Sequence, residues 1–187
     1  MKRVFRRCTF LAVTLVAACA EIAPQPDQFP VPPFELSGRI FVNDEEHRFS
    51  GQVRWERANG TDDIWLGAPL GQTVAHLHAD PGGATLTAAD QRSYSAGSIE
   101  ALTQRALGWR FPAAALRHWV LGEPSPGLPV SEVERDGSQR FVAFTQPPWR
   151  VTLAYREDAA SQPSRVDVAG NGATMRLVID AISLNKP

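Results

Sequence analysis

The residues best suited to chemistry in this sequence are two histidines, His76 and His78, which are followed by Asp80. Alternate residues of a β-strand share a face, so the two imidazoles could bind a zinc ion together. A zinc site needs a third and usually a fourth ligand, and the other histidines, His47 and His118, lie on different predicted elements. We therefore interpret the pair as solvated strand histidines and expect no metal site.

Motifs for catalysis are missing from the sequence. No Gly-x-Ser-x-Gly marks the strand-to-helix turn of a Ser-His-Asp hydrolase, and there is no phosphate-binding loop or dinucleotide fingerprint. The acid pairs Glu45-Glu46 and Asp62-Asp63 fall in predicted turns and indicate solvated loop charge. We expect a protein that is not an enzyme and that uses no cofactor.

The first 18 residues predict an export signal. Four basic residues precede a short apolar run, residues 10–18, which is too short to be read as a membrane-spanning helix. The sequence Val16-Ala17-Ala18-Cys19 resembles the bacterial lipobox, whose cysteine is acylated and becomes the first residue of the mature protein. Cys8 lies inside the signal, so Cys19 has no internal disulfide partner. Several acyl chains on Cys19 would hold the protein firmly in a membrane, whereas one chain binds reversibly.

Chain length and net charge limit the number of domains and the kinds of partner that the protein can have. Removing 18 residues from 187 leaves 169, which suits one domain with a substantial core. The signal holds four of the 19 basic residues and none of the 20 acidic ones, so the mature chain carries about five negative charges. Nothing in this balance indicates a nucleic-acid partner. No second apolar run is long enough to cross a membrane.

The elements that must position any site are mostly short strands. Five prolines in residues 24–33 exclude a helix, so we interpret residues 19–33 as the lipidated cysteine and an extended tether, followed by a single domain over residues 34–187. Period-two alternation and turn residues predict a large antiparallel sheet, curled or closed. The expected strands are 34–43, 48–56, 63–66, 73–79, 84–88, 91–95, 130–135, 140–145, 149–156, 165–169 and 173–182.

Between these two groups of strands the apolar period becomes helical. Ser98 can cap a helix that Gly108 ends, and Pro112, in a first-turn position, begins a second helix that Gly122 ends. Each helix is apolar on one face only and must pack that face against something. The concave side of the sheet is the available surface, so the predicted fold class is α+β.

The turn Gly67-Ala68-Pro69-Leu70-Gly71 has an unusual member. Pro69 presets φ and the glycines tolerate positive φ, but a hairpin tip normally carries polar residues rather than a leucine. Leu70 is either tucked beneath the sheet or held out from it, and composition alone favours the tucked position.

Aromatic residues are conspicuous in this chain. Each one alone is most simply a core residue, but together, in a curved sheet under two short helices, they could line an apolar cavity that takes up ligands by hydrophobic burial. The set is Phe34, Phe49, Trp55, Trp65, Trp109, Trp119, Phe141, Phe144, Trp149 and Tyr155.

Taken in order, several short motifs resemble the LolB family, outer-membrane lipoproteins that receive other lipoproteins from the periplasmic carrier LolA. The resemblance runs from about Phe34 to Asp180. It is carried by Leu36-Ser37-Gly38-Arg39-Ile40, Phe49 through Trp55, Pro69-Leu70-Gly71, Tyr94, Leu107-Gly108, Leu116-Arg117-x-Trp119-x-Leu121-Gly122-x-Pro124, Trp149-x-Val151-x-x-x-Tyr155 and Leu177-x-Ile179.

This resemblance implies an antiparallel half-barrel whose concave side is covered by short helices, with a hydrophobic cavity for acyl chains. It implies three partners, namely a LolA-like carrier, acylated lipoprotein cargo and outer-membrane lipid, and we expect a monomer. The family's projecting leucine, which delivers cargo into the membrane, corresponds to Leu70 within Pro69, Leu70 and Gly71. The expected cavity residues are Leu36, Ile40, Phe49, Val53, Trp55, Leu116, Trp119, Trp149 and Tyr155.

The resemblance also implies a cellular location, and the chain departs from the family pattern in two places. Ala20 follows Cys19, and under the sorting rule of enteric-type bacteria a residue other than Asp there implies the outer membrane. The family usually has a helix where this chain has its proline-rich tether, and often a Trp where this chain has Ala181-Ile182. Two other interpretations stay open, a structural or scaffolding lipoprotein and a binder of small hydrophobic ligands.

Overall fold

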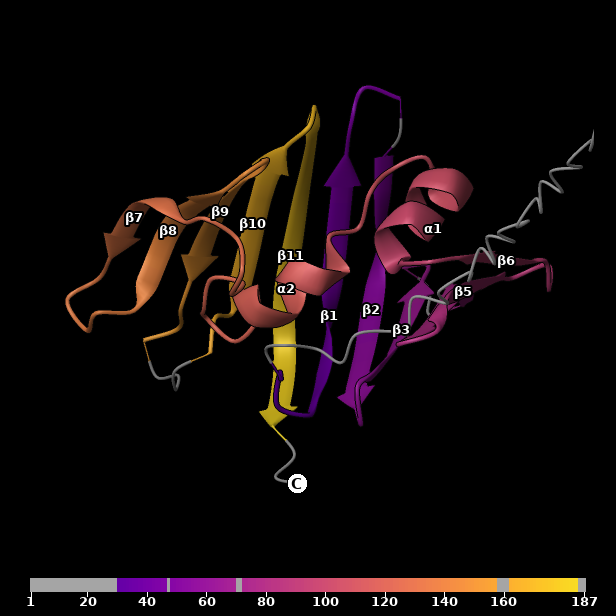
Figure 1. Ribbon diagram of the computed structural model, residues 1–187, viewed down its shortest axis with the longest axis horizontal. Coiled ribbons are helices and arrows are strands. Elements are labelled where there is room, and N and C mark those ends of the chain that lie inside the picture. The colour runs from indigo at the N-terminus through magenta and orange to yellow at the C-terminus, as the bar shows by residue number, and fades with distance from the viewer. Residues whose placement is uncertain (1–29, 47, 70–71, 158–161, 185–187) are drawn as a thin grey trace, which may run out of the picture.

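One open antiparallel sheet forms most of the computed structural model, which describes residues 30–46, 48–69, 72–157 and 162–184 (Figure 1). Within these residues the sheet has 11 strands in the order β6-β5-β4-β3-β2-β1-β11-β10-β9-β8-β7. The strands are β1 Phe34–Asn43, β2 Arg48–Ala58, β3 Thr61–Gly67, β4 Thr73–Asp80, β5 Gly83–Ala88, β6 Ser93–Ala96, β7 Ser131–Arg135, β8 Phe141–Gln146, β9 Trp149–Ala154, β10 Arg165–Gly170 and β11 Ala173–Leu184. The predicted antiparallel sheet with two short helices is therefore confirmed.

The sheet has one buried face. Along β1 the pattern is strictly alternating, with Phe34, Leu36, Ile40 and Val42 buried and the residues between them exposed. This is the period of two that side chains follow in a strand. The first and last strands meet at the centre of the sheet, where β1 pairs with β11 from Phe34 opposite Leu184 to Asn43 opposite Thr174.

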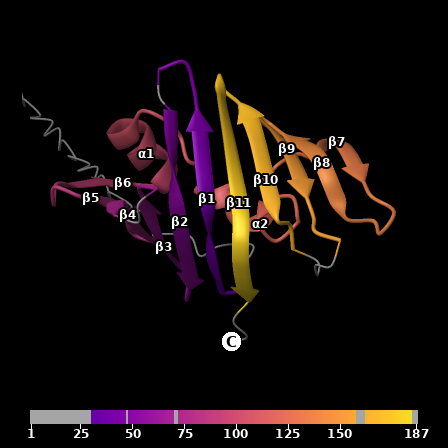
Figure 2. The ribbon, with the colours of Figure 1, turned by 180° about the vertical axis from the view of Figure 1, so that it is seen from behind.

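Two helices lie on the same face of the sheet, in front of it in Figure 1 and behind it in Figure 2. Helix α1, Ile99–Leu107, is capped by Ser98, whose hydroxyl accepts a hydrogen bond from the Ala101 amide (3.2 Å), and it ends at Gly108 with φ 81°. Helix α2, Ala113–Trp119, follows Pro112, which is the N-cap rather than a first-turn residue as expected. No helix among the described residues has the length and apolar character needed to span a bilayer.

Because neighbouring strands are antiparallel, five connections lie along the same side of the sheet, which we call the upper end after the β1–β2 and β10–β11 connections in Figure 1; the sheet twists, so β5 and β6 run across that view. They are the connections β1–β2, β3–β4, β5–β6, β8–β9 and β10–β11. The β3–β4 connection holds the predicted Pro69-Leu70-Gly71 tip.

A buried ion pair corrects one expectation from the sequence. Asp62 and Asp63 lie in β3 rather than in a solvated turn, and Asp62 is buried. Its carboxylate pairs with the buried Arg57 guanidinium (2.6 Å) and accepts a hydrogen bond from the Trp55 indole (2.9 Å). The other pair, Glu45 and Glu46, is exposed between β1 and β2, as expected.

Candidate functional site

The predicted cavity residues gather on the helix-bearing side of the sheet. Six of the nine are 0–4 % exposed and belong to one apolar cluster between sheet and helices, namely Leu36, Ile40, Val53, Trp55, Leu116 and Trp119. Trp119 on α2 also donates its indole N–H to the Gln146 side-chain oxygen on β8 (2.9 Å), so this helix is tied to the sheet by a buried polar contact.

The other three predicted cavity residues also belong to this region, Trp149 as a member of the cluster and Phe49 and Tyr155 as partly buried residues packed against it. Phe49 is partly buried and stacks on Trp109, with ring centroids 6.5 Å apart. Trp149 is 9 % exposed at the start of β9. The Tyr155 hydroxyl donates to the Phe141 carbonyl oxygen (2.9 Å), and burial raises the pKa of Tyr155.

An apolar gap separates the segment between the helices from the sheet. It is lined by Val42, Trp109, Arg110, Pro112, Trp149, Val168, Ala173, Thr174 and Met175. Its volume is about 10 Å³, close to the least that can hold one water molecule. Since this gap cannot hold an acyl chain, the predicted cavity stays a prediction.

The gap borders an open groove of about 600 Å³ near the upper end of the sheet. Both are lined by Trp109, Arg110, Trp149 and Ala173, and we call this shared region the mouth. The acidic segment from Asp44 to Glu46 also lines the groove.

Sequence reasoning placed Trp149 at the site but not Trp109, although Trp109 was among the conspicuous aromatics. The position of Trp109 could have been predicted from the sequence, because Trp109 directly follows the helix-ending Gly108 and so had to lie between the two helices.

The β3–β4 hairpin is described only at its base. The Ala68 amide donates to the Gln72 carbonyl oxygen (2.7 Å), which closes the turn, and Pro69 is exposed. Leu70, Gly71 and the predicted lipidation site Cys19 lie outside the described residues. Whether Leu70 is tucked in or held out is therefore still a prediction.

The histidine pair forms a polar cluster on the outer face. His76 Nε2 and His78 Nδ1 both contact the same oxygen of Asp63, at 2.9 and 3.0 Å, and the His76 ring stacks on Trp65. Asp80 accepts instead from the Gly82 amide in the β4–β5 turn (2.7 Å). In the described part of the chain, no three His, Cys, Asp or Glu side chains are grouped so as to hold a metal ion.

Comparison with known proteins identifies similar sequences and a similar fold. The family model described as "Outer membrane lipoprotein LolB" matches residues 32–181. An outer-membrane lipoprotein LolB from Nitrosomonas europaea is 37 % identical over 152 residues, covering 79 % of this chain and 71 % of that protein. One from an Azoarcus species is 34 % identical over 176 residues, covering 91 % and 90 %.

A solved structure supports the fold independently of sequence. The crystal structure of a LolA superfamily protein from Nitrosomonas europaea aligns with 88 % of this chain and 91 % of that one, with a TM-score of 0.51. The two sequences are only 8 % identical, so this likeness shows a common fold and no more.

Proposed function

Since the chain belongs to the LolB family of outer-membrane lipoproteins, we propose that it binds the acyl chains of incoming lipoproteins and inserts them into the outer membrane. Membership of the family makes it a lipid-anchored outer-membrane protein that acts as a receptor in lipoprotein localisation. Its carrier is a LolA-like protein and its cargo is acylated lipoproteins. Cys19 carries the anchor, residues 19–33 form the tether, and residues 34–187 form one domain that works as a monomer.

The observation that carries this proposal is the mouth, where Trp109 and Trp149 flank the apolar gap between the helices and the sheet. Burying Leu70 in lipid is worth about 2 kcal/mol, which is too little to anchor the protein but enough to disturb the lipid surface where the chain arrives.

Helices α1 and α2 act as a movable cover over the concave side of the sheet. The gap beneath them has about 10 Å³, so an acyl chain can enter only if the helices move away from the sheet. Each buried methylene contributes about 0.8 kcal/mol, and part of that gain offsets the cost of separating Leu102, Leu116 and Trp119 from the core. The net affinity is therefore lower than that of a permanently open pocket, which favours release into the bilayer.

Photocrosslinking tests this function. A photoreactive residue replacing Trp149 is expected to crosslink to the acyl chains of a bound lipoprotein. The matched control replaces Phe41, which is exposed on the opposite face of the sheet. Equal crosslinking from both positions, or none from Trp149, would contradict the proposal and favour a structural lipoprotein with a filled core.

A further inference from the structure

The two edges of the sheet are protected to different degrees. Strand β6 is four residues long and lies against α1, whereas β7 is bonded only to β8 among the described strands and is exposed at all five positions. An edge strand offers unpaired backbone N–H and C=O groups that can pair with another extended chain. Strand β7 is bulged, because its register with β8 shifts on both sides of Glu134 and Glu132 has φ 49°. Its outer backbone groups face no other described strand, so an added strand would have to follow this bulged edge.

Exposed apolar side chains concentrate at this edge. Of the five large apolar residues that are exposed in the described chain, three are Leu128, Val130 and Val133, each 42–46 % exposed. Val133 lies between two glutamates that both bind Arg150 on the outer face. Alternation between Val133 and Glu134 places Val133 on the helix-bearing face of the sheet; it does not extend to Glu132, which has φ 49° and contacts Arg150 from the same face as Glu134.

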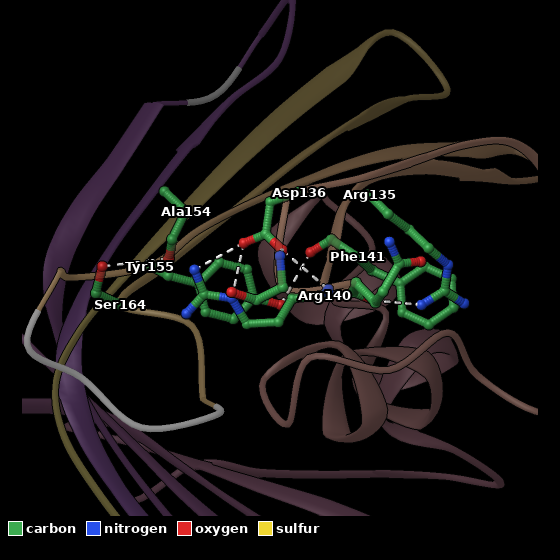
Figure 3. Close-up of polar contacts among 9 residues, drawn as sticks. Arg135, Asp136, Arg140, Phe141, Ala154, Tyr155 and Ser164 are labelled. Atoms are coloured by element: carbon green, nitrogen blue, oxygen red, sulfur yellow. Dashed lines mark hydrogen bonds and ion pairs between the residues drawn. The ribbon is translucent and has the colours of Figure 1, made fainter.

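The edge is held in place by polar contacts along its length. Arg150 pairs with Glu132 (3.0 Å) and Glu134 (2.7 Å), and the Arg135 guanidinium lies 3.6 Å from the centre of the Phe141 ring. Figure 3 shows the continuation of this arrangement, in which Asp136 pairs with Arg140 (2.7 Å), and Arg140 covers the ring of Tyr155. A pre-ordered edge loses less entropy when a second chain pairs with it.

A short path connects this edge with the mouth. Trp149 is paired with Gln146 across the β8–β9 turn, and the Gln146 amide donates to the carbonyl oxygens of Ser125 (2.7 Å) and Leu128 (3.4 Å). Strand β7 begins directly after this loop, at the upper end of the sheet. A peptide that emerges beside Trp149 would meet Leu128 and Val130 first and then the free edge of β7.

We propose that β7 binds, by strand addition, the extended peptide that follows the acylated cysteine of a cargo lipoprotein. This inference rests on the proposed function, because the acyl chains in the mouth would hold that peptide at high local concentration beside the edge. Five fully extended residues span about 17 Å, and the bulges make β7 shorter than this, which still leaves room for the first few residues of the peptide. Pairing through the backbone tolerates different side chains, which suits a receptor that accepts many cargoes.

The test compares three probes on the mature chain with Cys19→Ala, which keeps the protein in solution. The probes are a fluorescent fatty acid, a lipopeptide with the same acyl chain on cysteine followed by ten residues without proline, and that lipopeptide with alternate amides N-methylated. We expect the unmodified lipopeptide to bind about tenfold more tightly than its N-methylated form, and to slow hydrogen exchange in residues 131–135.

A double variant and a matched control locate the effect. Val130→Asp with Val133→Asp is expected to abolish the tenfold preference, whereas Phe41→Asp, a similarly exposed apolar site on the outer face, keeps it. Fatty-acid affinity is expected to be equal in all three proteins, and equal melting temperatures would show that the variants fold.

The possible failures are distinguishable. If the fatty acid binds but both lipopeptides bind equally well, the inference about β7 is wrong while the proposed function stands. If the fatty acid does not bind the parent protein, the proposed function itself fails. If the β7 amides are protected without any probe and the protein dimerises, a second copy occupies the edge and the inference is overturned.

Discussion

Asp62 and Asp63 are neighbours in the sequence but lie in opposite environments. The Asp62 side chain is 5 % exposed and neutralises the buried Arg57, whereas that of Asp63 is 28 % exposed beside two histidines. Asp62→Asn leaves the buried guanidinium facing a neutral amide and should lower the free energy of unfolding by about 3 kcal/mol. Asp63→Asn should cost less than about 1 kcal/mol. Urea unfolding at neutral pH measures both, and equal losses would contradict the assigned roles.

Asp63 also predicts a pH dependence at the residue scale. Burial acts to raise its pKa, but hydrogen bonds from His78 and His76 and the charges of these histidines lower it overall below the ordinary 3.8. A lowered carboxyl pKa stabilises the fold above the ordinary value, and this stability is lost as the pH falls through the folded-state pKa. The difference between parent and Asp63→Asn should therefore be present well above the ordinary value of 3.8 and be lost as the pH falls below it, through the folded-state pKa. A difference that persists in acid would show that the histidine contacts are not responsible.

At the scale of elements, α2 is held to the sheet by apolar packing and by the buried hydrogen bond from Trp119 to Gln146. Trp119→Phe removes that bond while Gln146 keeps its contacts with Ser125. If the helices are a movable cover, this variant should take up a fluorescent fatty acid several-fold faster, and α2 should exchange its amides faster. Stopped-flow fluorescence and hydrogen exchange measure the two effects. Faster exchange with unchanged uptake would mean that α2 does not control entry.

The elements themselves were largely predictable because their signals are local. Alternation along β1, the cap Ser98 and the terminator Gly108 each act within a few residues, and the structure confirms them. The environment of Asp62 was missed although Arg57 is only five residues away and directly opposite it across the β2–β3 hairpin, because charged side chains give no sign in the sequence that they face the core. The size of the gap at the mouth depends on small displacements of Trp109 and Trp149, which no sequence period reports.

At the scale of the whole molecule, the β3–β4 hairpin contributes none of the residues that line the mouth, so transfer should depend on a residue that the cavity does not need. Leu70→Glu is expected to leave folding and cargo uptake intact and to stop insertion into the membrane, because a carboxylate is poorly tolerated in lipid. Transfer of a labelled lipoprotein to liposomes measures this, with Phe41→Glu as the control. Normal insertion by Leu70→Glu would refute the role of the tip.

The position of β1 has a consequence for how the polypeptide matures after export. Its hydrogen-bonding partners are β2, which follows it directly, and β11, which is the last of the described strands along the chain. Until residues 173–184 have been exported, the half of the sheet from β1 to β6 is not joined to the half from β7 to β10. During this time β1 lacks a neighbouring strand on one side. Pairing between strands that are far apart in the sequence slows folding. The newly exported chain must therefore pass through a stage in which the apolar face of β1 is exposed to solvent in the periplasm.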